Sequence, residues 1–324
     1  MRSVELPASS LRVSAICLGT ADTGTAIDEA TAMRMLDMFR DRGGTFVDTA
    51  LVYGEWAPGG QYASERLIGR WLRERSGRDR TVVATKGGHP PLEAMHRSRL
   101  GRAEIEADVQ ASLRNLQVDY IDLYYLHRDD PARPVEEIVE TLYGLAQAGS
   151  IRYAGCSNWR AARIRAAQAH ARSLGWQGFV ADQMLWNLAA VDMGALDGTG
   201  TAAMDGDLLA LHSETGMAAV PWSAQANGLF DKMARGALDT LRPAHRRLYA
   251  PPENQRRFER ARQLAAETGL SINQIVLGYL MSQPFTTVPV VGPRSPEQLE
   301  DTLRAGDVLL SPEQVRFLET GERA

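Results

Sequence analysis

Short apolar runs alternate with amphipathic stretches along most of the chain. Behind Asp28, a residue type that caps helix N-termini, Ala32, Met35, Leu36 and Phe39 follow the i, i+3, i+4, i+7 spacing of one helix face. The runs between such stretches are almost continuously apolar, as is typical of strands that are buried on both faces. The pattern therefore predicts buried parallel strands that alternate with helices.

This alternation predicts a β-hairpin, eight further strands and a series of helices. The hairpin pairs residues 3–6 with residues 11–14. The strands are expected at 16–18, 45–48, 80–85, 121–126, 153–157, 179–182, 217–221 and 286–291. The helices are expected at 28–42, 64–74, 103–116, 134–148, 160–173, 205–215, 255–268, 271–282 and 295–304, followed by a helical tail at 310–319.

Eight strands with helical crossovers close into a barrel, because such crossovers are right-handed. A doubly wound open sheet is the main alternative, but it needs a glycine-rich turn after its first strand, and Gly19-Thr20-Ala21-Asp22-Thr23-Gly24 lacks the G-x-G-x-x-G spacing. No shift in composition marks a domain boundary. We therefore expect an (α/β)8 TIM barrel with an N-terminal β-hairpin cap, in a single domain over residues 1–324.

Three connections at the carboxyl ends of the strands are long and are predicted to be irregular. They are 87–102 after strand three, 187–204 after strand six and 222–254 after strand seven. In a barrel of this type the chemistry takes place at the carboxyl-terminal face. Long loops in a compact domain are usually lids or binding loops, so we expect these three to surround the functional site.

Composition and charge restrict the kind of partner. Hydrophobic residues make up 44% and charged residues 23% of the 324 residues, which is ordinary for a packed soluble protein. The net charge of −4 lacks the basic surface of a nucleic-acid-binding protein, and no apolar run approaches the roughly 20 residues of a membrane span. We expect a cytoplasmic protein with neither nucleic acid nor membrane as partner; the oligomeric state stays open.

Metal and disulfide chemistry find no support in the sequence. Cys17 and Cys156 lie in apolar strand-like runs, which indicates buried thiols, and two cysteines are too few for a disulfide framework or a thiolate zinc site. The six histidines show no metal-ligand spacing. We therefore expect no metal.

Four residues at or just beyond strand ends suggest a proton-transfer site. Lys86 and His127 come directly after strands three and four, Asp48 stands at the end of strand two, and Tyr53 follows Asp48 in the next loop. An ammonium beside a phenol favours the phenolate and lowers the phenol's pKa, a carboxylate keeps the lysine charged, and a neutral imidazole orients a carbonyl oxygen. The set suits protonation of a developing alkoxide while hydride arrives at carbon.

Each of these residues also has a structural alternative. Asp48 would cap a turn, Lys86 would be a solvated charge, His127 would be a hydrogen-bonded structural residue, and Tyr53 would pack at the rim. Their placement at successive strand ends favours the joint chemical interpretation.

Several motifs in order along the chain resemble the aldo-keto reductases. They are FVDTA at 46–50 with Tyr53-Gly54, ATK at 84–86, DLYYLH at 122–127, GCSNW at 155–159 followed by Gln183, and VGPRS at 291–295. The resemblance implies an oxidoreductase that reduces an aldehyde or ketone to an alcohol, with hydride from C4 of a nicotinamide cofactor. Tyr53 would be the general acid, Lys86 and Asp48 its pKa-lowering pair, and His127 the carbonyl-orienting group.

The same resemblance assigns the nicotinamide end of the cofactor site. Ser157, Asn158 and Gln183 would bond the carboxamide, and Trp222 would stack on the ring where tyrosine is more usual in the family. Helix capping by Ser157 and Asn158, and rim packing by Trp222, stay open. Thr20, Asp22 and Ser223 are also expected to approach the cofactor.

The phosphate end is predicted at Gly292-Pro293-Arg294, ahead of a helix that starts with the S-P-E-Q capping sequence. The same four letters recur at 311–314, so only the residues in front distinguish the first copy. The resemblance places Gly292 and Arg294 at the 2′-phosphate of NADPH and Gln298 near the adenine. Thr302 stands where the family often has Asn, which leaves the choice between NADPH and NADH open.

Polar and indole side chains are expected around the mouth of the barrel, where the substrate would enter. Trp56, His89, Arg128 and Trp186 suit a hydroxylated, sugar-like carbonyl, although Trp186 faces either substrate or core. A cofactor-binding regulatory subunit that resembles channel β subunits, with little turnover, is the alternative function. The basic residues Arg242, His245, Arg246 and Arg247 form either a solvated patch or a lid over the cofactor phosphates.

Overall fold

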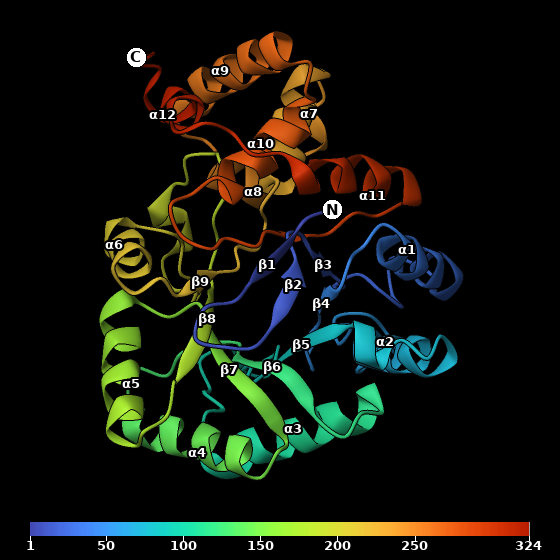
Figure 1. Ribbon diagram of the computed structural model, residues 1–324, viewed down its shortest axis with the longest axis vertical. Coiled ribbons are helices and arrows are strands. Elements are labelled where there is room, and N and C mark those ends of the chain that lie inside the picture. The colour runs from blue at the N-terminus through green and yellow to red at the C-terminus, as the bar shows by residue number, and fades with distance from the viewer. Residues whose placement is uncertain (324) are drawn as a thin grey trace.

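Eight parallel strands form the centre of the computed structural model, which describes residues 1–323 (Figure 1). Their order in the sheet is β10-β3-β4-β5-β6-β7-β8-β9. The ring closes where Ala219 N donates to Thr286 O and Val288 N donates to Ala219 O. The strands are β3 (Cys17–Gly19), β4 (Phe46–Asp48), β5 (Val82–Gly87), β6 (Ile121–Leu126), β7 (Ile151–Ser157), β8 (Phe179–Gln183), β9 (Ala218–Ala219) and β10 (Val290–Val291). The predicted (α/β)8 barrel is confirmed.

The N-terminal hairpin closes one end of the barrel. Strands β1 (Ser3–Glu5) and β2 (Arg12–Ser14) pair antiparallel and lie across the barrel in Figure 1. Ser14 Oγ accepts from the backbone N–H of Phe46 at the start of β4, and Leu6 packs among the side chains that fill the barrel interior. The hairpin therefore covers the amino ends of the strands and leaves the carboxyl ends for the site.

Most helices surround the strands as the apolar spacing predicts. The first helix begins after Asp28, whose side chain accepts from Thr31 N, and it buries the predicted apolar stripe. Figure 1 shows these helices around the barrel. They are α1 (Glu29–Asp41), α2 (Ala63–Glu74), α3 (Arg102–Leu116), α4 (Val135–Gln147), α5 (Ala161–Ser173), α6 (Gly206–Thr215) and α11 (Pro296–Leu303).

The remaining helices gather on one side of the barrel, at the top of Figure 1. They are α7 (Leu229–Ala234), α8 (Pro243–Leu248), α9 (Glu253–Thr268), α10 (Ile272–Met281) and α12 (Pro312–Thr320). The prediction that 222–254 is irregular is therefore wrong, because α7 and α8 lie within it. Each has only six residues, which is too short to show a helical period in the sequence.

Three strand predictions need correction at their ends. β5 runs to Gly87, so that Lys86 lies on the strand and not after it. β9 and β10 hold two residues each, fewer than predicted, although backbone bonds such as Val290 N to Pro221 O continue the ladder. Strand ends depend on the partner strand, and single-sequence patterns do not carry that information. No helix within residues 1–323 is both long and apolar enough to cross a membrane.

Candidate active site

A cavity of about 920 Å³ opens at the carboxyl ends of the strands. Its lining runs from Asp48, Tyr53 and His127 at one end to Arg294 and Gln298 at the other. A cavity whose lining contains both aromatic and cationic side chains suits a ligand that has an aromatic ring and anionic groups.

Lys86 joins the predicted acid and its carboxylate neighbour. Its Nζ lies 2.6 Å from Asp48 Oδ2, 3.1 Å from the Tyr53 hydroxyl and 2.8 Å from Thr49 O. Asp48 Oδ1 accepts from Gln183 Nε2 at 2.8 Å. Lys86 and Asp48 are fully buried, so their ion pair acts with little screening by water.

Burial and charge set the protonation states of this group. Burial lowers the pKa of Lys86, but Asp48 and Tyr53 raise it by more, so the ammonium stays charged. For Tyr53, burial raises the phenol's pKa and outweighs the opposing effect of Lys86, while Asp48 raises it further. The expectation that Lys86 brings the phenol's pKa below its ordinary value is therefore wrong. The phenol is neutral and protonated at physiological pH.

His127 completes the group. Its ring centroid lies 5.9 Å from that of Tyr53 at an interplanar angle of 76°, and its Nδ1 is buried without a hydrogen-bond partner among residues 1–323. Burial lowers the pKa of His127 well below its usual value, and the charges of Lys86 and Arg128 add to this. The imidazole is therefore neutral, as the sequence reasoning expected.

The predicted carboxamide residues lie beside this group. Asn158 has a left-handed backbone (φ 64°), and its Nδ2 donates to His127 O at 3.2 Å and to Ser157 Oγ at 3.0 Å. The N-cap of α5 is Arg160, so neither Ser157 nor Asn158 caps that helix. Together with Gln183, these residues line the cavity.

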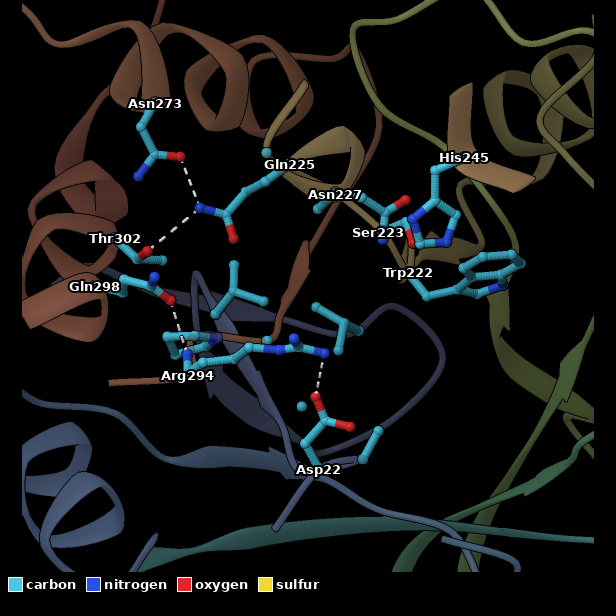
Figure 2. Close-up of a pocket in the computed structure, with 18 of the residues that line it drawn as sticks. Asp22, Trp222, Ser223, Gln225, Asn227, His245, Asn273, Arg294, Gln298 and Thr302 are labelled. Carbon is cyan, nitrogen blue, oxygen red and sulfur yellow. Dashed lines mark hydrogen bonds and ion pairs between the residues drawn. The ribbon is translucent and has the colours of Figure 1, made fainter. Parts of the chain in front are cut away.

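Trp222 and Ser223 line the cavity near α8 (Figure 2). The indole Nε1 of Trp222 is buried without a partner among residues 1–323, and its backbone N–H donates to Met184 O. The following turn contains left-handed residues at Ser223 (φ 52°) and Asn227 (φ 55°). Ala226 (φ 49°) and Gly228 (φ 76°) are left-handed as well, and their N–H groups donate to Ser223 O and Gln225 O within the turn.

At the far end of the cavity, Arg294 NH2 donates to Asp22 Oδ2 at 2.7 Å (Figure 2). Gln298 Oε1 accepts from Arg294 N at 2.9 Å, so it does not close a capping box with Ser295. The second S-P-E-Q copy does form the complete box at the start of α12. The two S-P-E-Q copies therefore differ in their hydrogen bonds. Gly292 lines the cavity together with Arg294. Thr20 also lines the cavity, where its hydroxyl donates to Asp48 O at 2.8 Å.

A network of hydrogen-bonded polar side chains, not predicted from the sequence, lies at the same end of the cavity as Arg294. Gln225 Nε2 donates to Asn273 Oδ1 at 2.6 Å and to Thr302 Oγ1 at 3.3 Å (Figure 2). Asn273 Nδ2 in turn donates to Asp301 Oδ2 at 2.8 Å. Asn273 lies on α10, far from Gln225 in sequence. The one available signal was Thr302, which stands where the family often has an amide.

The four residues that the sequence predicts at the substrate mouth do not all line the cavity. Arg128 lines the cavity, whereas Trp56 and His89 lie outside its lining. The ring centroid of the exposed Trp56 lies 6.0 Å from that of Tyr53, and the centroid of His89 lies 4.8 Å from that of His127. The prediction that Trp186 lies at the substrate mouth is wrong. It is buried outside the cavity lining, in the core.

Trp186 stacks on Phe285 at 5.9 Å and meets Tyr279 edge-on. Its backbone N–H lies 3.5 Å from Trp222 O, and the indole is directed into the apolar cluster beside the barrel. In the basic group, Arg242 and His245 line the cavity, while Arg246 and Arg247 are exposed outside it.

Residues 15–320 match the Aldo/keto reductase family. The chain belongs to this family. An uncharacterized oxidoreductase of Bacillus subtilis, YrpG, is 32% identical, over 98% of this chain and 95% of that protein. Norsolorinic acid reductase of Aspergillus flavus is 31% identical, over 97% of this chain and 79% of that protein. Aryl-alcohol dehydrogenase (NADP+) of Phanerodontia chrysosporium is 30% identical, over 96% of this chain and 83% of that protein. The names of these relatives of this aldo/keto reductase describe an oxidoreductase, a reductase and an alcohol dehydrogenase.

Proposed function

We propose that this aldo/keto reductase reduces an aldehyde or ketone to an alcohol with NADPH, and that Tyr53 is the general acid. The observation that carries the proposal is Lys86, whose Nζ contacts both Asp48 and the Tyr53 hydroxyl beside the neutral ring of His127.

In this proposal the four residues have complementary tasks. The bound nicotinamide supplies hydride to the carbonyl carbon. Neutral His127 donates an N–H to the carbonyl oxygen, and Tyr53 gives its proton to the same oxygen as negative charge develops there. Lys86, kept charged by Asp48, then stabilises the phenolate that remains on Tyr53. A raised phenol pKa keeps the proton on Tyr53 until the oxyanion forms.

The lining of the cavity fits a nicotinamide dinucleotide. The indole N–H of Trp222 has no hydrogen-bond partner among residues 1–323 and can donate to a polar group of a ligand that stacks on the flat ring. Arg294 supplies a cation elsewhere in the lining. The proposed cofactor residues are Thr20, Asp22, Ser157, Asn158, Gln183, Trp222, Ser223, Gly292, Arg294 and Gln298. The name of the NADP+-dependent relative supports NADPH over NADH.

Two substrate classes compete. The polar and indole groups Trp56, His89 and Arg128 support the predicted sugar-like carbonyl, whereas the names of the aryl-alcohol and norsolorinic acid relatives support an aromatic carbonyl. The test is NADPH oxidation with benzaldehydes, a sugar aldehyde and a keto-sugar, each at matched concentration. We expect turnover of at least one class that Tyr53→Phe abolishes. Full activity in Tyr53→Phe would reject its role as the acid.

A regulatory subunit that holds its cofactor without turnover is the second candidate. The complete set of Asp48, Tyr53, Lys86 and His127 favours the enzyme, because the Tyr53 hydroxyl, the ammonium of Lys86 and the neutral ring of His127 lie together as proton transfer to a carbonyl oxygen requires. Steady-state turnover beyond one equivalent of NADPH separates the two functions.

A further inference from the structure

Arg128 carries a half-buried positive charge in the cavity without a carboxylate partner. It directly follows His127 at the end of β6. No Asp or Glu oxygen of residues 1–323 lies within ion-pair distance of it, its Nε is buried and unpartnered, and its one hydrogen bond reaches His127 O at 3.5 Å. Leaving a guanidinium this dry and unpaired is unfavourable unless a ligand completes it.

The chain offers acids next to Arg128 and uses them elsewhere. Asp129 is the next residue, yet its carboxylate lies 3.2 Å from Arg163 Nε. Asp130 turns toward Arg133. The other half-buried arginines among residues 1–323 are ion-paired, apart from Arg2, which donates to Met281 O. The isolation of Arg128 is therefore a local feature of the site.

The groups around Arg128 leave its charge uncompensated. Its charge acts on Tyr53, His127 and His89. Burial raises the pKa of Tyr53 and lowers the pKa of both histidines, so all three are neutral at physiological pH. On another side, a Cβ at Gly200 in the loop after β8 would lie 3.7 Å from Arg128 Cδ, so an uncharged loop lies beside this part of the side chain.

We propose that the substrate carries an anionic group, a carboxylate near its reacting carbonyl, and that Arg128 binds it. The inference rests on the proposed carbonyl reduction. A guanidinium bonds a carboxylate through two parallel N–H groups, which would fix the substrate relative to His127 in the next position of the chain. A cofactor phosphate has related chemistry, but the predicted phosphate residue is Arg294, a separate cation of the same lining that follows β10.

The test pairs two substrates with three variants of the full chain. The substrates are 3-carboxybenzaldehyde and its methyl ester, which differ in charge at the same position. The variants are Arg128→Gln, Arg128→Lys and, as a matched control, Arg97→Gln at an exposed loop arginine. Each is assayed for kcat/KM with both aldehydes, for NADPH binding and for thermal unfolding.

We expect the unmodified protein to prefer the acid over the ester by about tenfold or more, as for a charge-assisted hydrogen bond. Arg128→Gln should lose about that preference, measured as the ratio of kcat/KM for the acid to kcat/KM for the ester, while its NADPH affinity changes less than about threefold. Arg128→Lys should retain part of the preference, and Arg97→Gln all of it. Benzoate should inhibit the unmodified protein more strongly than benzamide, which tests the charge even if a variant fails to fold.

Three results would overturn the inference. Equal turnover of acid and ester by the unmodified protein, together with equal inhibition by benzoate and benzamide, would remove the anionic substrate and leave carbonyl reduction intact. Weakened NADPH binding in Arg128→Gln with unchanged acid preference would assign the guanidinium to the cofactor. Absence of turnover with both aldehydes and the wider carbonyl panel would reject the proposed function itself.

Discussion

Arg294 and Asp22 form an ion pair of 2.7 Å that joins the turn after β10 to the loop after β3 across the end of the cavity (Figure 2). The guanidinium is 56% exposed and the carboxylate 29%, so the pair contributes little to stability. A phosphate that binds Arg294 would have to compete with Asp22 for the same donors.

Removing the competitor should favour binding of NADPH over NADH. Asp22→Asn is expected to raise the ratio of NADPH to NADH affinity by a few-fold, because the phosphate then meets an unpaired guanidinium and no negative neighbour, whereas a contact of Asp22 with the part shared by both cofactors affects both affinities alike. Arg294→Ala should weaken NADPH binding by about tenfold or more and NADH binding much less. Fluorescence titration with both cofactors measures the two effects.

A suitable control is Arg262→Ala, since Arg262 lies on α9 and pairs with Glu259 outside the cavity lining. Its cofactor affinities should equal those of the unmodified protein. Equal losses of NADPH and NADH affinity in Arg294→Ala would contradict a 2′-phosphate contact.

Tyr53→Phe should abolish turnover and leave cofactor binding nearly unchanged. The phenyl ring keeps the edge contacts with Trp56 and His127, and Lys86 retains Asp48 and Thr49 O as acceptors. Loss of a positioned general acid lowers kcat by about 10²–10⁴-fold. Single-turnover rates with prebound NADPH would measure the loss, and a fall of less than threefold would exclude Tyr53 as the proton donor.

The sequence predicted which residues lie together in the site, but it did not predict how burial changes their pKa values. Asp48 and Lys86 could be placed together because carboxyl ends of neighbouring parallel strands meet at one face, and their 2.6 Å contact confirms that placement. The sign of the Tyr53 pKa shift could not be predicted, since it depends on how completely the fold removes water from the phenol.

The directions of the Trp186 and Asn273 side chains could not be predicted from the sequence either. Trp186 lies beyond β8, next to Leu185, which forms isolated bridges with Ala203 and Trp222, and such long-range pairing is not visible in the local sequence. Asn273 meets Gln225 only through tertiary packing of α10. The role of each proposed site residue, and the single-domain organisation, stay predictions.

Breaking the buried ion pair should destabilise the fold. Lys86→Met leaves Asp48 as a buried carboxylate with Gln183 as its remaining side-chain donor, and such unpaired charges cost about 3–5 kcal/mol. The double variant Lys86→Met with Asp48→Asn removes both charges and should recover much of that loss. Urea unfolding measures the two free energies; equal losses in both variants would mean that packing, and not charge, dominates at this position.

Neutral His127 should make the fold sensitive to acid. Its pKa is lowered by folding from about 6.5, so the unfolded chain binds the proton first. The contribution is fully present above pH 6.5 and is lost as the pH falls toward the folded-state value, by up to about 1.4 kcal/mol per pH unit. In His127→Gln, unfolding free energies between pH 7.5 and 5.5 should decline less steeply. The exposed His96→Gln is the control and should keep the original slope.

Gly155 should be irreplaceable, because β7 and its neighbours leave no room for a side chain there. A Cβ at this position would lie 2.5 Å from the Tyr125 ring and 2.8 Å from Ala181 O, where the β7–β8 register shifts. Gly155→Ala is expected to destabilise the fold by about 1–3 kcal/mol, as overpacking does, and to displace Ser157 two residues on. Gly144→Ala is the matched control: Gly144 is exposed within α4 with open space around it, so alanine should stabilise by about 0.5–1 kcal/mol. Thermal unfolding of the two variants would therefore move in opposite directions, and a shared direction would show that the close approach of Tyr125 to β7 is easily relieved.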